Sequence, residues 1–169
     1  WSARLWCTCL WGMTMTFEKA FAKLIGHEGG YVNNPRDPGG ETKFGISKRA
    51  YPALNIADLT LDDAKAIYRR DYWNRAQCDR LHPDVAFQVF DGAVNSGIGN
   101  SIRWMQEAAG VAVDGIVGPL TLRKVGDMDT AIVIARYNGV RLKFMASLST
   151  WDVFGRGWAR RIAANLMEI

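Results

Sequence analysis

The sequence predicts a mainly α-helical fold with one small β- or turn-rich lobe near its beginning. Apolar residues recur at helical spacing over most of the chain, whereas residues 29–47 concentrate glycine, proline and asparagine. No strong linker interrupts residues 13–169, which favours a single domain. A chain of 169 residues is long enough to bury a sizeable core without metals or disulfides.

The first predicted helix covers about residues 17–27. Thr16 is a plausible N-cap, and Gly29 and Gly30 are expected to stop the helix. One face of this helix is apolar at positions i, i+4, i+7 and i+8, which are Phe17, Phe21, Leu24 and Ile25. The following segment, residues 29–47, reads GGYVNNPRDPGGETKFGIS and predicts turns with a small hairpin or a short strand at 43–47.

The remaining chain predicts further helices. Thr60 and Asp63 resemble a capping box, which opens a helix with Leu61, Ala64, Tyr68 and Tyr72 on one face. Three later helices are expected at residues 119–125, 130–148 and 153–166.

Two more helices are predicted between the helix that follows Thr60 and the one at 119–125, from residues typical of helix ends. Pro83 suits the first turn of a helix that ends near Gly97. Asn100 is a candidate N-cap for the next helix, with Gly110 at its end.

Charge and cysteine usage narrow the class of partner. The formal net charge of +4 suits an anionic polymer, such as nucleic acid, anionic lipid or bacterial cell wall. We expect no nucleic-acid partner, because arginine-rich tracts and zinc spacings are absent. We expect no stable membrane insertion either, because no apolar run approaches about 18 residues. The three cysteines, Cys7, Cys9 and Cys78, are read as free thiols, and no metal site is expected.

Residues 1–12 differ from the rest of the chain. They hold three tryptophans and two of the cysteines, and Met13 and Met15 follow at once. We interpret this segment as a non-native or targeting extension and exclude it from the predicted fold.

Glu28 is the first candidate for chemistry. It stands where a helix ends, and the carbonyls of a helix C-terminus disfavour a nearby anion, so its carboxyl is suited to donate a proton. Asp37 and Thr42 follow across a turn that can fold back toward the helix end. The alternatives are an ordinary surface glutamate, an aspartate that only builds a turn, and a threonine that only precedes a strand.

Several motifs together resemble glycoside hydrolase family 108, bacterial and phage N-acetylmuramidases with a lysozyme-like fold. They are Glu-Gly-Gly-Tyr at 28–31, Asn-Asn-Pro-Arg-Asp-Pro-Gly-Gly at 33–40, Thr-Lys-Phe-Gly-Ile-Ser at 42–47, Ala-Ile-Tyr at 66–68, Tyr-Trp at 72–73 and Asp-Gly-Ala-Val-Asn-Ser-Gly at 91–97. The resemblance implies Glu28 as catalytic acid, Asp37 as the group that orients or activates water, and Thr42 as an assisting residue. It implies hydrolysis of peptidoglycan between N-acetylmuramic acid and N-acetylglucosamine, in the periplasm or outside the cell.

The second half of the chain is similar to peptidoglycan-binding regions, notably at Asp-Gly-Ile-Val-Gly-Pro, residues 114–119. It is expected to form one wall of the sugar cleft, although Asp114 and the glycines are equally suited to a plain turn. We therefore divide residues 13–169 into a catalytic-motif half, 13–90, and a peptidoglycan-binding-like helical half, 91–169. The expected substrate-binding residues are Tyr31, Lys43, Phe44, Asn95 and Ser96.

Other aromatic residues at helical spacing, Tyr72, Trp73 and Trp104, are more simply explained by packing. The arginines at 156, 160 and 161 are interpreted as a solvated basic face. No cofactor is expected, because carboxyl groups suffice for acid catalysis. The protein is expected to act as a monomer. The competing interpretations are a lytic transglycosylase and a non-catalytic wall-binding protein. The presence of Glu28, Asp37 and Thr42 disfavours the second.

Overall fold

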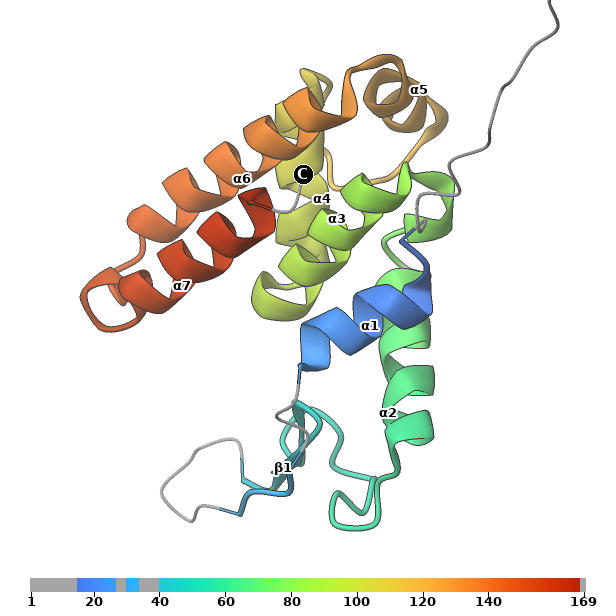
Figure 1. Ribbon diagram of the computed structural model, residues 1–169, viewed down its shortest axis with the longest axis vertical. Coiled ribbons are helices and arrows are strands. Elements are labelled where there is room, and N and C mark those ends of the chain that lie inside the picture. Colours follow the sequence, from blue (N-terminus) through green and yellow to red (C-terminus); the bar gives the residue numbers. More distant parts are fainter. Residues whose placement is uncertain (1–14, 27–29, 34–39, 168–169) are drawn as a thin grey trace, which may run out of the picture.

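The computed structural model describes residues 15–26, 30–33 and 40–167 and is mainly helical, with a lysozyme-like α+β fold (Figure 1). Its elements in chain order are α1 Phe17–Ile25, β1 Thr42–Lys43, β2 Ile46–Ser47, α2 Leu61–Tyr68, a π-helical turn Arg69–Trp73, a 3-10 turn Cys78–Arg80, α3 Pro83–Ser96, α4 Ile98–Ala109, α5 Pro119–Asp127, α6 Thr130–Ala146 and α7 Trp151–Leu166. The small lobe holding the hairpin lies at one end of the molecule, and α4 and α5 lie at the other.

The helix α1 begins as its sequence predicts. Thr16 is the N-cap, and its side chain accepts a hydrogen bond from the backbone N–H of Lys19 at 3.4 Å. The helix ends at Ile25, two residues earlier than expected, with Gly26 as its C-cap at φ +59°. Its buried face, which includes Phe17 and Phe21, packs on the rest of the core.

The capping box of α2 is confirmed. Thr60 accepts from the backbone N–H of Asp63 at 3.1 Å, and the Asp63 carboxylate accepts from the backbone N–H of Thr60 at 3.1 Å. Leu61, which we expected on the apolar face, is 48% exposed, because it is the first residue of the helix and lies outside the packed surface. The chain then continues through a π-helical turn that buries Trp73.

The helix α3 is the centre of the core. Pro83 occupies its first turn, as predicted, and a run of nine residues from Val85 to Ala93 is buried. The Phe90 ring meets those of Phe17 and Trp73 edge-on, at centroid distances of 6.0 and 5.4 Å. Because α3 contacts α1, α4 and α6, it joins the two halves of the chain.

The N-cap predicted at Asn100 is wrong. Gly97 has φ +86°, which lets the chain turn sharply in one residue, so α4 begins at once with Ile98. The side-chain amide of Asn100 instead donates to the carbonyl of Ser96 at 2.8 Å. Gly110 ends α4 in the left-handed conformation, as expected.

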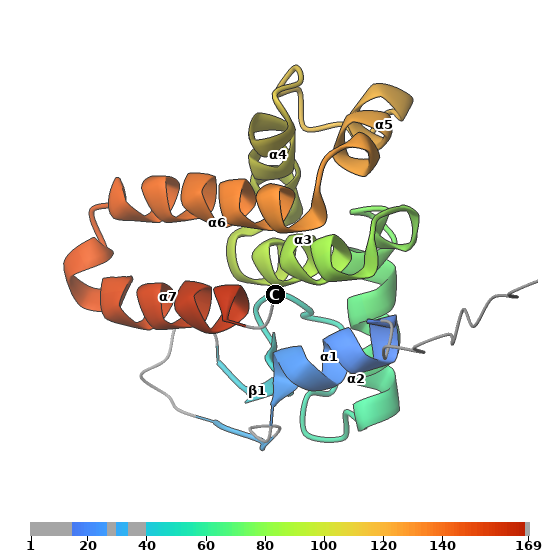
Figure 2. The same ribbon diagram turned by 45° about the horizontal axis from the view of Figure 1, so that its top comes forward.

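The last two helices run antiparallel with α3 beside them (Figure 2). α6 ends at Ala146, so Leu148 lies beyond it in a turn, and α7 begins at Trp151 rather than at residue 153. Among the described residues, none of the helices has both the length and the apolar character needed to cross a bilayer.

Candidate active site

The two principal candidates, Glu28 and Asp37, lie in segments 27–29 and 34–39, outside the described residues. Their catalytic roles therefore stay predictions. The structure does describe the chain on either side of both segments: the end of α1, residues 30–33, and the strand that begins at Thr42.

An isolated β-bridge joins Val32 to Thr42. The backbone N–H of each residue donates to the carbonyl of the other at 2.8 Å. The side chain of Thr42 donates to the carbonyl of Gly40 at 3.4 Å. This bridge brings together the chain that follows Glu28 and the chain that follows Asp37, which places Thr42 where both segments are anchored.

The hairpin is a two-residue type I′ turn with an unusual first residue. β1 and β2 pair antiparallel, with Thr42 opposite Ser47 and Lys43 opposite Ile46. The turn residues Phe44 and Gly45 have φ values of +52° and +75°, and this turn requires positive φ at both positions. The sequence predicted the hairpin from its glycines, but a bulky aromatic residue rarely adopts positive φ.

Tyr68 holds this turn from the side of α2. Its hydroxyl donates to the carbonyl of Phe44 at 3.1 Å, and a Cβ on Gly45 would lie 2.6 Å from the same hydroxyl oxygen. Burial raises the pKa of Tyr68 to about 12, so the phenol keeps its proton and remains a donor at neutral pH. The buried side chain of Tyr68, at the end of α2, thereby fixes the turn that follows Thr42.

The expected substrate-binding residues of this lobe differ in how much of each side chain is exposed and in the contacts that it already makes. Tyr31 is 44% exposed beside the Val32 bridge. The Phe44 ring is partly buried against the core. The Lys43 ammonium donates to the carbonyl of Ala57 at 2.7 Å, which ties β1 to the loop before α2.

Asn95 and Ser96 are the last two residues of α3, which ends at Gly97 as predicted. The Asn95 amide donates to the backbone carbonyl of Asp91 at 2.7 Å and lies 3.5 Å from the Asp91 carboxylate. Asn95 is exposed, so part of its side chain faces solvent at the end of the central helix.

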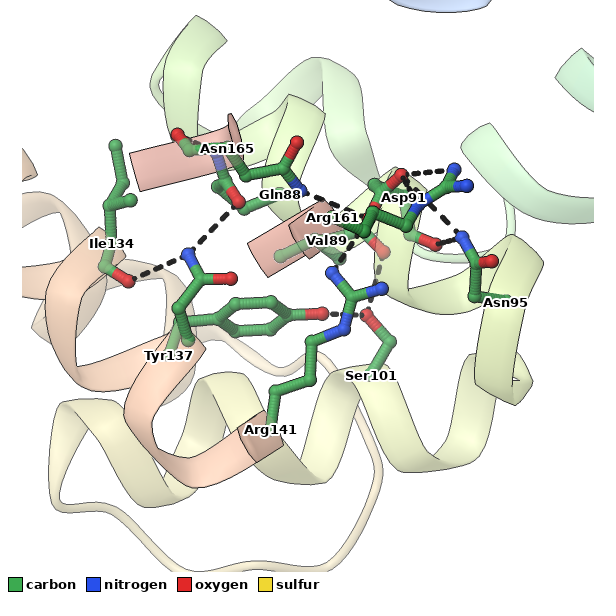
Figure 3. Close-up of polar contacts among 11 residues, drawn as sticks. Gln88, Val89, Asp91, Asn95, Ser101, Ile134, Tyr137, Arg141, Arg161 and Asn165 are labelled. Atoms are coloured by element: carbon green, nitrogen blue, oxygen red, sulfur yellow. Dashed lines mark hydrogen bonds and ion pairs between the residues drawn. The ribbon is translucent and has the colours of Figure 1, made fainter. Parts of the chain in front are cut away.

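Asp91 is the centre of a buried ionic network that sequence reasoning missed (Figure 3). One carboxylate oxygen accepts from Arg141 of α6 at 2.6 Å and from Asn165 of α7 at 3.1 Å. The other accepts from the Nε and Nη2 of Arg161 at 2.8 and 2.6 Å. The interpretation of Arg161 as part of a solvated face is therefore wrong, because this carboxylate draws its guanidinium toward the core.

The charges of this network decide the state of Asp91. Burial alone would raise the pKa of Asp91, but the hydrogen bond from Arg161 and the positive charges of Arg141 and Arg161 outweigh burial and hold the pKa below its usual range. The carboxylate is therefore ionised at neutral pH. The signal in the sequence was a lone acid within an otherwise apolar helical stretch, since such charges are rarely buried unless they are paired.

Asp114, whose role was left open between cleft wall and turn, builds a turn. Its carboxylate accepts from the backbone N–H of Ile116 at 2.8 Å and from the side-chain amide of Gln106 at 2.6 Å. The hydrogen bond from Gln106 lowers the pKa of Asp114 below its ordinary value. Gln106 also accepts from the N–H of Gly115 at 2.8 Å, so the loop before α5 is organised from α4.

The packing explanation of the other aromatic residues is confirmed for Trp73 and Trp104, which are 2% and 4% exposed. Cys78 is a buried free thiol, as expected, whereas Cys7 and Cys9 lie outside the described residues. Within residues 15–26, 30–33 and 40–167, no three His, Cys, Asp or Glu side chains are grouped so as to hold a metal ion.

Comparison with known proteins gives matches along most of the chain. A family model described as Glycosyl hydrolase 108 matches residues 21–97, and one described as Predicted Peptidoglycan domain matches residues 100–163. The solved structure of SagA from Brucella abortus is 33% identical, with a TM-score of 0.81 over 90% of this chain and 92% of that one. No curated protein sequence matches the chain significantly.

Proposed function

The chain belongs to the glycosyl hydrolase 108 family, and from this we propose that it hydrolyses the β-1,4 bond between N-acetylmuramic acid and N-acetylglucosamine, with Glu28 as the general acid. Membership makes the protein a glycoside hydrolase that acts on peptidoglycan, outside the cytoplasm. The bond and the residue roles are the proposal. So are action as a monomer, in the periplasm or outside the cell, and the absence of a nucleic-acid partner.

The observation that carries the proposal is the place of Glu28 relative to α1. This helix closes at its C-cap Gly26, and Glu28 follows two residues later in the Glu-Gly-Gly-Tyr motif. The partial negative charge of a helix C-terminus disfavours an adjacent carboxylate. A carboxyl that stays protonated near neutral pH can donate its proton to the leaving glycosidic oxygen.

Asp37 is proposed to position the attacking water, with Thr42 assisting. Asp37 precedes Thr42 by five residues, and a chain spans at most about 3.6 Å per residue, so connectivity keeps Asp37 within reach of the Val32–Thr42 bridge. Inverting glycosidases separate their two carboxyls by roughly 6.5–9.5 Å to admit water, whereas retaining ones hold them about 5 Å apart. We favour the inverting arrangement.

The proposed sugar contacts come from two elements. Tyr31, Lys43 and Phe44 accompany Thr42 at the bridge and hairpin, and Asn95 and Ser96 lie at the end of α3. The exposure of Tyr31 and Asn95 supports contacts with a ligand. We further propose that residues 13–169 form one domain, with a catalytic half at 13–90 and a binding half at 91–169, because α3 packs against helices of both halves.

Analysis of digested walls tests the proposed reaction. Products are reduced with borohydride and their sugar alcohols are identified by mass spectrometry. Hydrolysis at the proposed bond gives N-acetylmuramitol. N-acetylglucosaminitol would assign the other glycosidic bond, and anhydro-muramic ends, lighter by one water and not reducible, would identify a lytic transglycosylase.

A further inference from the structure

Three aromatic rings form a continuous cluster on the surface of α7. The ring centroid of Phe154 lies 5.8 Å from that of Trp158, which in turn lies 6.2 Å from that of Trp151. Phe154 is 53% exposed, and the two tryptophans are only partly buried. Large contiguous apolar patches on a protein surface mark interaction sites, which makes this cluster a candidate binding surface.

Gly155 shows how the cluster is seated on the helix. A Cβ at this position would lie 2.6 Å from the indole of Trp151, so only glycine lets that ring lie against the helix backbone. Glycine destabilises a helix interior relative to alanine. Its presence in the middle of α7 therefore indicates that the position of the Trp151 ring matters.

The cluster shares one side of α7 with Arg161. Phe154, Trp158 and Arg161 stand at i, i+4 and i+7, which places them along one flank of the helix. Arg161 binds the same Asp91 carboxylate oxygen that Asn95 approaches at 3.5 Å. The aromatic flank therefore continues toward the exposed end of α3.

The helix α7 also lies near the small lobe. Burial raises the pKa of Tyr68, and the positive charge of Arg161 acts on the Tyr68 phenol in the opposite direction, so the two groups are within electrostatic range. The Tyr68 hydroxyl holds the hairpin turn at Phe44. In Figures 1 and 2, α7 and the hairpin lie on the same side of the molecule.

We propose that Phe154 and Trp158 form a stacking site for an N-acetylhexosamine ring of the glycan strand, beyond the sugars at the cleaved bond. This inference rests on the proposed action on glycan strands. A pyranose ring presents an apolar C–H face to an aromatic ring, whereas its hydroxyls stay in water.

Charge and family membership both favour this occupant. α7 carries two exposed arginines, Arg156 and Arg160, against the single acid Asp152, and their charge attracts the carboxylates that peptidoglycan carries on its lactyl and peptide groups. The cluster also falls within residues 100–163, which the peptidoglycan-domain model matches.

The test measures binding separately from cleavage. In a Glu28→Gln background, the full chain is sedimented with purified cell walls, and the bound fraction is followed against wall concentration. Phe154→Ala should weaken binding about five- to tenfold, because about half of a phenylalanine side chain loses its apolar cover. Phe154→Tyr keeps a stacking face and should bind as the parent does.

Val153→Ala is the matched control, since Val153 is 74% exposed on the same turn but lies off the aromatic flank. Equal binding by Phe154→Ala and Val153→Ala would overturn the proposal. A Phe154→Ala effect confined to anionic phospholipid vesicles would assign the cluster to a membrane surface, and one confined to self-association in ultracentrifugation would assign it to a second copy. Neither outcome would touch the proposed cleavage, which the product analysis tests independently.

Discussion

Asp91 shows how a single carboxylate can determine the packing of three helices. It is 1% exposed, and Arg141, which it binds at 2.6 Å, is fully buried. Such a pair is weak evidence for net stability, because both ions lose their hydration. Removing one partner is strongly destabilising, because the remaining buried charge is left without an opposite charge.

Asp91→Asn should lower the free energy of unfolding by about 3–5 kcal/mol at neutral pH, because Arg141 would stay buried and uncompensated. Urea unfolding followed by circular dichroism measures this change. Asp84→Asn is the control: it alters an exposed acid in the first turn of the same helix and should cost less than about 1 kcal/mol. Similar losses for both variants would contradict a special role for Asp91.

The difference in stability between wild type and Asp91→Asn should also depend on pH. The pKa of Asp91 is lower in the folded state than the value of about 3.9 for an unfolded chain. Its stabilising contribution is therefore complete above the unfolded pKa and is lost as the pH falls through the folded pKa. The difference in unfolding free energy between wild type and Asp91→Asn should stay constant from pH 7 to 5 and shrink below about pH 4. A difference that persists to pH 2 would show that the charge is not its source.

Glu28→Gln should reduce wall hydrolysis by at least about 100-fold, because the amide keeps the size of the side chain but has no proton to transfer. Loss of turbidity of purified walls reports the rate, and the melting temperature reports folding. Glu18→Gln, at the other end of α1, removes an exposed acid that pairs with Arg69 at 3.4 Å and should leave the rate unchanged. A folded Glu28→Gln enzyme with near-normal activity would exclude Glu28 as the acid.

At the scale of elements, the hairpin turn depends on the small size of Gly45 and on Tyr68. Gly45→Ala should destabilise the turn, because alanine at φ +75° is strained and its Cβ would meet the Tyr68 hydroxyl at 2.6 Å. Wall hydrolysis should fall with it, since Thr42 belongs to the same hairpin. Gly126→Ala, within α5, where nothing lies within 4 Å of an added Cβ, should not destabilise the protein.

A double-mutant cycle checks the stated cause. Tyr68→Phe alone should cost about 1 kcal/mol, the typical worth of one hydrogen bond. In the Tyr68→Phe protein, Gly45→Ala should lower the free energy of unfolding by less than it does in the wild type, because the hydroxyl that the new Cβ would meet is absent. Strict additivity of the two changes would mean that backbone strain, and not the contact, is responsible.

Elements defined by local signals were predictable, and those set by distant contacts were not. The capping box at Thr60, Pro83 in α3 and Gly110 after α4 all act within a few residues, and each is where the sequence indicated. Asn100 misled because the sharp turn at Gly97 starts α4 earlier. Near the site, the glycines predicted the hairpin that contains Thr42, but nothing local distinguishes Arg161 from Arg160. Its partner Asp91 lies 70 residues away.

At the scale of the whole molecule, α3 belongs to both halves. It ends the segment matched by the hydrolase model, yet its buried surface packs on α4 and α6. A fragment of residues 13–97 should therefore lack a cooperative unfolding transition, because Asp91 and its apolar neighbours would face water. A fragment with a sharp urea transition of its own would show that the halves are separate domains.

Residues 1–12 should be dispensable, since they match no part of the family motifs and precede the capped start of α1. A chain beginning at Met15 should keep the melting temperature and the lytic rate of the full chain. Loss of stability would show that the tryptophans of this segment pack on the domain, and loss of lysis alone would show that they hold the enzyme at its substrate.

The long separation within the Asp91 network also bears on how the protein is made. Arg141, Arg161 and Asn165 are translated 50, 70 and 74 residues after Asp91, so the nascent chain carries this acid before the side chains that bind it exist. The central helix cannot reach its native packing until α7 has left the ribosome. Packing of the core is therefore coupled to the synthesis of α7 and not to that of the hydrolase motifs, although the two lie far apart in the chain.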